Sequence, residues 1–191
     1  MHKLICIVGQ TCSGKDSLVQ KLIENHPDKF KAVCSYTDRP KRDNETEGVE
    51  HQFLTYEEFN KLIEEHELIA YTEISGRRYA ATKDQLEYSN IYIIDPLGIK
   101  YLRENCKDID IYEVFILAPV EDMIERSKTS RSDYYTSFAA RLESEKDQFD
   151  DYKENAEYDL LIYNENGLFD KAYSTLEEKL LEIIEWKKKR M

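Results

Sequence analysis

Two kinds of hydrophobic pattern alternate along most of this chain. Short apolar runs, typical of strands buried on both faces, occupy residues 4–8, 30–34, 91–94, 111–118 and 160–163. Elsewhere, apolar side chains recur every three or four positions, which predicts helices over residues 15–26, 119–128, 134–152 and 168–187. Strands that alternate with helices are typical of an α/β fold with a parallel central sheet and helices on both of its faces.

Residues 35–89 interrupt this alternation with shorter and more varied segments. They begin with a polar stretch that contains Pro40 and Gly48, which predicts an irregular loop. The patterns that follow predict a strand at 51–54, a helix at 56–66, a hairpin of strands 68–74 and 78–81, and a short helix at 82–88. We therefore expect an α+β region inserted into the core that holds the parallel sheet.

A glycine-rich turn follows the first strand and opens the first helix. The sequence Gly9-Gln-Thr-Cys-Ser-Gly14-Lys15 has the glycine and lysine spacing of a phosphate-binding loop. Backbone N–H groups from Thr11 to Lys15 and the positive end of the helix dipole would form an anion site, and Lys15 would reach the β- and γ-phosphates of a nucleotide. The alternative is a plain strand–helix corner. The flanking strand and helix favour the loop of a P-loop NTPase fold with three layers.

The residues that would hold Mg²⁺ depart from the usual pattern of such loops. Asp16 follows the lysine directly, where Ser or Thr commonly ligates the ion, and Ser17 comes one position later. Asp95 follows the strand at 91–94, the usual position of a second acidic ligand. The alternative for Asp95 is a helix N-cap before Pro96. We expect Mg²⁺ to be bound by Asp16 or Ser17, together with Asp95.

Charge and cysteine content indicate which partners and which cellular location to expect. The 191 residues carry a net charge of −12, with 39 acidic and 27 basic side chains. Binding to nucleic acid or to an anionic membrane needs a basic surface, so we expect neither partner. The four cysteines are scattered, and no apolar stretch is long enough for a signal peptide or a membrane span. We expect a cytoplasmic protein; the sequence does not predict an oligomeric state.

The polar loop at 35–53 resembles the acceptor-binding segment of guanylate kinases. Seven residues match that family's pattern in register, without a gap: Ser35, Thr37, Arg39, Arg42, Glu45, Gly48 and Phe53. Later stretches are also similar to the family, namely Gly76–Tyr79, Asp95–Gly98, Arg141–Leu142 and Tyr158–Asp159 with Asn164. The resemblance covers essentially the whole chain.

The resemblance implies an ATP-dependent kinase that moves the γ-phosphoryl group of ATP, with Mg²⁺, to the phosphate of a nucleoside monophosphate. It implies that the acceptor is bound by Ser35, Arg39, Arg42, His51 and Tyr79. The catalytic residues would be Lys15, Arg131 and Arg141. The residues that bind ATP would be Gly9, Thr11, Cys12, Ser13, Gly14, Lys15, Asp16, Ser17 and, beside the adenine, Asn164.

The same resemblance implies a functional division of the chain. A P-loop core would comprise residues 1–34, 90–126 and 151–191, an acceptor-binding region residues 35–89, and a helical lid residues 127–150. Arg131 and Arg141 would both belong to that lid and would stabilise charge on the transferred phosphoryl group. In the family pattern, the first of these arginines falls at Ser130, one position before Arg131.

Several departures from the family concern the acceptor. Its guanine-reading glutamate and threonine fall at Ala70 and Ala81, and His51 replaces a tyrosine that binds phosphate. GMP or dGMP is therefore the first candidate acceptor, with guanine specificity left open. One alternative is an enzyme like ribose 1,5-bisphosphate phosphokinase, because Gly14-Lys-Asp-Ser17 resembles the loop of those enzymes. Another is a non-catalytic binding module, although such modules generally lack the loop residues that are present here.

Overall fold

The computed structural model describes residues 3–42, 45–74, 76–130 and 134–188. The chain divides into two compact units. The first unit consists of residues 1–6 and 31–111, and the second unit of residues 7–30 and 112–191. Strands β1 (Lys3–Val8) and β7 (Asp110–Leu117) contribute residues to both units.

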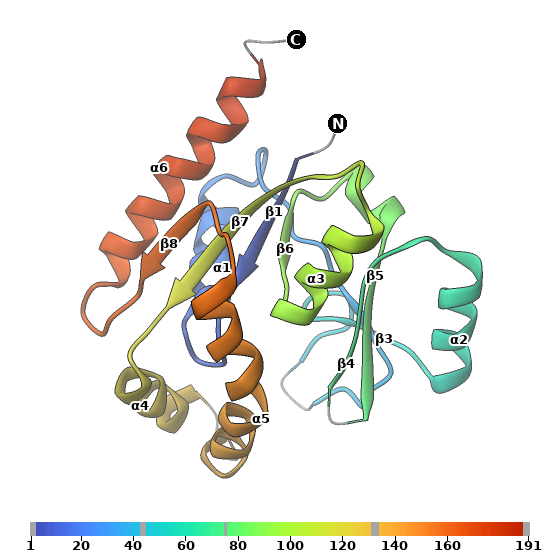
Figure 1. The fold of residues 1–191 in the computed structure, drawn as a ribbon, viewed down its shortest axis with the longest axis horizontal. Helices are drawn as coiled ribbons and strands as arrows, with labels where there is room; N and C mark the ends of the chain where they lie inside the picture. Colours follow the sequence, from blue (N-terminus) through green and yellow to red (C-terminus); the bar gives the residue numbers. More distant parts are fainter. Residues whose placement is uncertain (1–2, 43–44, 75, 131–133, 189–191) are drawn as a thin grey trace. The chain divides into compact units, whose positions relative to one another are not determined.

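A four-stranded parallel sheet has the strand order β6-β1-β7-β8 (Figure 1). Its outer strands are β6 (Ile91–Ile93) and β8 (Leu160–Tyr163). The apolar runs of the sequence account for its burial, because Leu4 to Val8 and Val114 to Ile116 are almost wholly shielded from solvent. The parallel sheet and the α/β class predicted from the sequence are confirmed.

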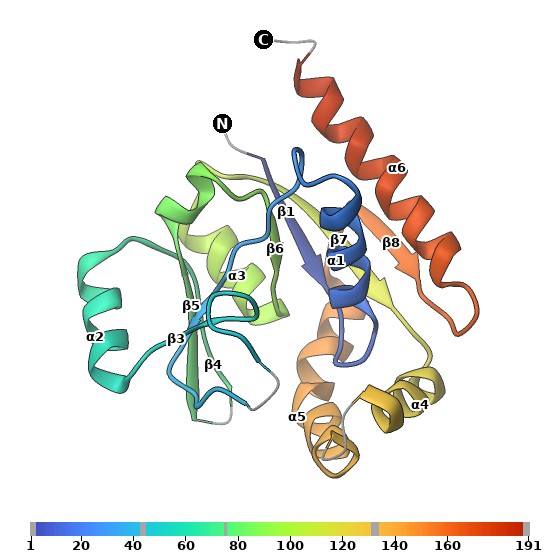
Figure 2. The same cartoon turned by 180° about the vertical axis from the view of Figure 1, so that it is seen from behind.

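Helices of the second unit cover both faces of the sheet. Helix α1 (Lys15–Asn25) packs against α6 (Phe169–Lys188), and α5 (Tyr134–Asn155) lies on the opposite face from α1 (Figure 1 and Figure 2). The ring of Phe115 on β7 contacts two rings of α5, those of Phe149 and Tyr152, at centroid distances of 6.4 and 5.0 Å. These aromatic contacts attach α5 to the sheet.

Helix α4 (Val120–Ser130) packs beside α5. A buried cluster of Ala118, Met123 and Phe138 joins the two helices to the end of β7. Cys12 of the glycine-rich turn and Leu142 of α5 pack against the same cluster. The turn after β1 and the two helices therefore share one apolar contact region.

A second four-stranded sheet, with the order β3-β2-β5-β4, lies in the first unit. Strand β2 (Tyr36–Thr37) pairs in parallel with β3 (Gln52–Phe53) and antiparallel with β5 (Arg77–Thr82), which pairs antiparallel with β4 (Leu68–Ile74). Helix α2 (Tyr56–Glu65) packs its buried Phe59 and Leu62 against Ala80. The predicted helix at 56–66 and the hairpin strands are thus present.

Three segments differ from the sequence predictions. Of residues 30–34, only Ala32 pairs, as an isolated parallel bridge to Ile91. Residues Tyr36–Thr37 form strand β2, within the stretch that the sequence predicts as an irregular loop. The short helix predicted at 82–88 is present as a 3₁₀ helix over Lys83–Glu87. Helix α3 (Pro96–Asn105) is not predicted from apolar spacing, because its buried apolar positions span fewer than two turns; only the N-cap alternative for Asp95 anticipates it.

The functional division of the chain stays a prediction. The strands β2 to β5 and helix α2 fall within the predicted acceptor region at 35–89, and most of α5 falls within the predicted lid at 127–150. Among the helices of the described residues, none is both long and apolar enough to cross a membrane.

Candidate active site

The glycine-rich turn between β1 and α1 has the strand–turn–helix setting of a phosphate loop. Gly14 has a φ of 86° at the start of α1, a conformation that glycine adopts without strain. Gly9 is required for space, because a Cβ there would lie 2.7 Å from Ser13 Oγ and 2.8 Å from the carbonyl oxygen of Ile116. The two glycines therefore allow the turn to be tight.

Two side chains hold the carbonyl groups of the loop. Arg126 donates from Nη1 to the carbonyl oxygens of Ser13 (3.0 Å) and Cys12 (3.3 Å), and from Nη2 to that of Asn164 (2.6 Å). The buried Asn164 donates from Nδ2 to the Ser13 carbonyl oxygen at 2.7 Å. Asn164, expected beside the adenine, thus supports the backbone of the loop.

Sequence reasoning did not identify Arg126. It lies on a helix predicted from its apolar spacing, and no motif marks it. The available signal is its place after strand β7, since ligand sites of α/β sheets gather beyond the carboxyl ends of the strands. That signal applies equally to its neighbours, so a single sequence could not select it.

The backbone N–H group of Thr11 donates a hydrogen bond to a side-chain carboxylate. Glu145 of α5 accepts a hydrogen bond from it at Oε2, at 3.0 Å, and Oε1 of the same carboxylate lies 3.6 Å from Nη2 of Arg141. Glu145 was not among the residues that the sequence singled out. The loop and a lid arginine, both predicted to bind phosphate, thus meet at one carboxylate.

Lys15 and Asp16 form an ion pair at the start of α1. The distance from Lys15 Nζ to Asp16 Oδ2 is 3.2 Å, and the Lys15 ammonium lowers the pKa of the Asp16 carboxyl. Asp16 is 73% exposed and Ser17 is also exposed, so both oxygens are accessible. Carboxylate and hydroxyl oxygens suit Mg²⁺, which commonly keeps waters and shares nucleotide phosphates. Within the described ranges, no group of three or more His, Cys, Asp or Glu side chains could hold a metal.

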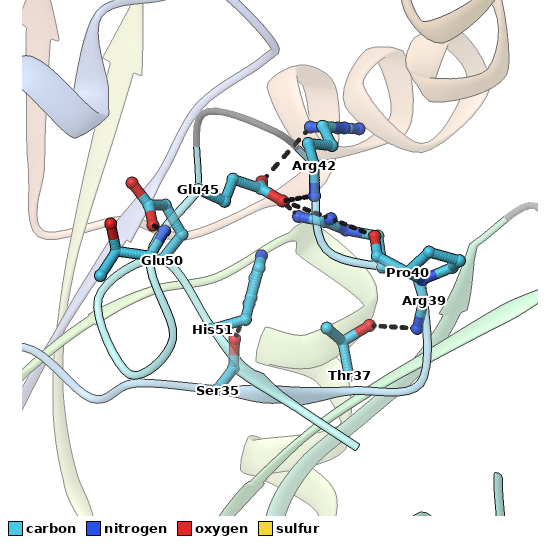
Figure 3. A network of polar contacts seen from close by, with 9 residues as sticks. Ser35, Thr37, Arg39, Pro40, Arg42, Glu45, Glu50 and His51 are labelled. Carbon is cyan, nitrogen blue, oxygen red and sulfur yellow. Dashed lines mark hydrogen bonds and ion pairs between the residues drawn. The ribbon is translucent and has the colours of Figure 1, made fainter. Parts of the chain in front are cut away.

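The polar loop of the first unit is organised around a buried carboxylate, that of Glu45 (Figure 3). Arg39 donates from Nη1 and Nη2 to the two oxygens of Glu45, at 2.7 and 2.6 Å. The backbone N–H of Arg42 donates to the same carboxylate at 2.9 Å, and Arg42 Nη1 lies 3.6 Å from it. The hydrogen bonds from Arg39, with a smaller effect from Arg42, lower the pKa of Glu45 to about 2. Glu45 therefore fixes both arginines of the predicted acceptor site.

Arg39 and Arg42 differ in exposure. The guanidinium of Arg39 is buried and lies 5.1 Å from the ring centroid of Phe53. The side chain of Arg42 is 45% exposed, so it can reach a ligand in solution. Two guanidinium groups on one carboxylate leave a local excess of positive charge in an acidic protein, and guanidinium groups bind phosphate well.

The other predicted acceptor residues gather around His51. Ser35 Oγ lies 2.8 Å from His51 Nδ1, and the ring of Tyr79 meets the His51 ring edge-to-face at a centroid distance of 5.6 Å. Burial, and next the charge of Arg39, hold the pKa of His51 below its usual value. The structure thus brings Ser35, His51, Tyr79 and the arginine pair into one cluster.

Asp95 caps the first turn of helix α3. Its Oδ1 accepts a hydrogen bond from the Gly98 N–H at 2.9 Å, and its Oδ2 accepts one from the hydroxyl of Thr72 at 3.2 Å. Asp95 is therefore the N-cap of α3, which is the alternative role that the sequence offered for it. The expected Mg²⁺ role of Asp95 stays a prediction, as does the catalytic role of Arg131, which lies outside the described residues.

The predicted site residues are divided between the two compact units. Lys15, Arg141, Asn164 and the rest of the phosphate loop belong to the second unit, whereas Ser35, Arg39, Arg42, His51, Tyr79 and Asp95 belong to the first. Each unit carries one set of groups suited to an anion. The loop set offers backbone N–H groups and a lysine, and the arginine set offers guanidinium groups.

Comparisons with known proteins, by family model, by sequence and by structure, point to one family. The family model for guanylate kinase matches residues 1–183. The chain is 29% identical to a guanylate kinase of Schizosaccharomyces pombe (92% of this chain, 88% of that protein) and 31% identical to one of Histophilus somni (93% and 86%). In fold it is similar to a crystal structure of guanylate kinase from Anaplasma phagocytophilum, with a TM-score of 0.66 and 20% identity over 96% of this chain and 87% of that one.

Proposed function

The chain belongs to the guanylate kinase family, and we propose that it moves the γ-phosphoryl group of ATP to the phosphate of a nucleoside monophosphate, with GMP or dGMP as the first acceptor. The observation that carries the proposal is the presence of two sets of phosphate-binding groups on one chain. One set is the loop whose Thr11 N–H already binds a carboxylate, and the other is the Arg39–Arg42 pair on Glu45. A donor phosphate and an acceptor phosphate each need such a set.

In this mechanism the loop binds the phosphates of ATP. Backbone N–H groups near Thr11 and at the amino end of α1 donate hydrogen bonds to the phosphate oxygens. Arg126 and Asn164 donate hydrogen bonds to a carbonyl oxygen of the loop, so that this oxygen points toward the protein. Lys15 supplies positive charge to the β- and γ-phosphates. Because phosphoryl transfer depends on positioning and charge stabilisation, these fixed donors supply much of the catalysis.

The arginine pair would bind the acceptor. Arg42, and Arg39 held by Glu45, would grip the acceptor phosphate, with Tyr79 and His51 beside it. An oxygen of that phosphate attacks the γ-phosphorus, the bond from phosphorus to the β–γ bridging oxygen breaks, and ADP leaves. Mg²⁺, bound with the nucleotide near Asp16 and Ser17, would neutralise charge on the phosphates.

Substitution of Arg42 tests the acceptor assignment. We expect Arg42→Ala to raise KM for GMP about tenfold or more, with a much smaller change in KM for ATP, because a charged hydrogen bond contributes roughly 1.5–3 kcal/mol. Lys41→Ala is the matched control, since Lys41 is exposed, cationic and adjacent. If the two variants behave alike, the arginine pair is not the acceptor site.

We also propose a cytoplasmic location. Its support is the state of the cysteines: Cys6, Cys12, Cys34 and Cys106 all lie within the described residues, and none forms a disulfide. Reduced thiols are typical of cytoplasmic proteins. The small-molecule partners would be ATP and the nucleoside monophosphate.

A further inference from the structure

A carboxylate of helix α5 occupies part of the phosphate loop. Glu145 accepts the Thr11 N–H at 3.0 Å with one oxygen and lies 3.6 Å from Arg141 Nη2 with the other. The Glu145 side chain is only 15% exposed, although the residues on either side of it along the helix are exposed. One carboxylate therefore contacts a loop N–H group and a lid guanidinium together.

These two partners are the kinds of group that bind phosphate oxygens. Backbone N–H groups beside a helix N-terminus attract anions, and guanidinium groups form charge-assisted hydrogen bonds with them. The Glu145 carboxylate thus stands where a phosphate oxygen would be expected. Because one N–H hydrogen forms one strong hydrogen bond, a phosphate that takes the Thr11 N–H must displace Glu145.

The packing of α5 brings Glu145 to this position. Leu142 and Cys12 both pack against the cluster of Ala118, Met123 and Phe138. Leu142 and Glu145 are three positions apart and so share a face of the helix. The loop between β1 and α1 lies beside α5 in both views (Figure 1 and Figure 2). The apolar contact therefore keeps the carboxylate beside the loop.

We propose that Glu145 competes with the donor nucleotide for the phosphate loop and thereby sets the affinity for ATP. This inference rests on the proposed function, because it takes the ATP phosphates as the competing ligand. The observed affinity is the intrinsic affinity multiplied by the fraction of molecules in which the loop is available.

Equilibrium binding of ATP to two variants tests this competition. Glu145→Gln keeps an oxygen that can accept from Thr11 but loses the charge, whereas Glu145→Ala loses both. We expect the dissociation constant for ATP to fall about threefold in the Gln variant and about tenfold in the Ala variant. Glu143→Gln is the matched control, because Glu143 is an exposed carboxylate of the same helix. Its effect should stay within about twofold.

Each outcome decides the proposal. Unchanged or weaker ATP binding in both Glu145 variants would overturn it, provided that thermal unfolding shows them folded. Equal tightening in Glu143→Gln would also overturn it, since the cause would then be the charge of the helix as a whole. If the unsubstituted protein binds no ATP, the proposed function itself fails, which separates that failure from failure of the competition alone.

Discussion

Single carboxylates decide how the phosphate-binding groups of this protein are presented. Glu45 holds Arg39 and the backbone of Arg42, and Glu145 holds Thr11 and Arg141. A buried carboxylate is costly unless it is paired, and each of these is paired with groups expected to bind phosphate. The acidic composition of the chain is thus compatible with anion binding, because local contacts outweigh net charge over short distances.

The pairing of Glu45 predicts a specific loss of stability in acid. Its pKa is lowered from 4.5 to about 2, so its stabilising contribution is complete above about pH 4.5 and is lost as the pH falls toward 2. We expect the difference in free energy of unfolding between the unsubstituted protein and Glu45→Gln to shrink by about 3 kcal/mol over that interval. Denaturant titrations at several pH values measure it. Glu64→Gln, an exposed carboxylate, is the control; a pH-independent difference would contradict the ion pair.

Ala70 and Ala81 carry a prediction about the acceptor base. They are direct partners across β4 and β5, and both are buried. The resemblance to the family places its guanine-reading residues at these two positions. Without a carboxylate there, selectivity for guanine should be about ten- to hundredfold lower, the effect of one charged hydrogen bond. We expect Ala70→Glu to raise the ratio of kcat/KM for GMP over AMP by about tenfold.

The control for this substitution is Ala70→Gln, which adds similar volume without charge. Both variants must keep their unfolding temperature, because position 70 is only 3% exposed. An unchanged ratio in a folded Ala70→Glu variant would show that another side chain, such as Thr72, reads the base.

Most elements could be predicted from their apolar patterns, whereas helix α3 and the two-residue strand β2 could not. The helix at 56–66 and the strands of the parallel sheet have clear patterns, whereas the buried apolar positions of α3 span fewer than two turns and residues 30–34 pair only at Ala32. The phosphate loop and the arginine loop could be located because their motifs are local in sequence. Arg126 and Glu145 could not, because each reaches the loop from more than 100 residues away.

Ligand binding should slow the amide hydrogen exchange of two segments in particular. If α5 carries the lid and residues 35–53 the acceptor loop, their backbone amides should be protected when ADP and GMP are bound together, because kinase lids close over their ligands and exclude water. Hydrogen exchange followed by mass spectrometry measures this, with α6 as the internal reference. Equal exchange with and without saturating ligands would count against lid closure.

At the scale of the whole molecule, the proposed function draws on residues of both compact units. The loop that would bind ATP belongs to the second unit and the arginine pair that would bind the acceptor to the first, with β1 and β7 contributing to both. Family membership favours phosphoryl transfer to a nucleoside monophosphate over a sugar phosphate acceptor or a non-catalytic module. The central claim is therefore catalytic and can be tested on the intact chain.

The most direct test is ADP formation from ATP and Mg²⁺ with GMP, dGMP, AMP, UMP, CMP, ribose 1,5-bisphosphate or no acceptor. We predict turnover that requires a nucleoside monophosphate and includes GMP or dGMP. Lys15→Ala should lower its kcat by at least about a hundredfold, the effect of losing one group that stabilises transition-state charge. Turnover with ribose 1,5-bisphosphate alone, no transfer to any nucleoside monophosphate, or an unimpaired Lys15→Ala variant would contradict the account.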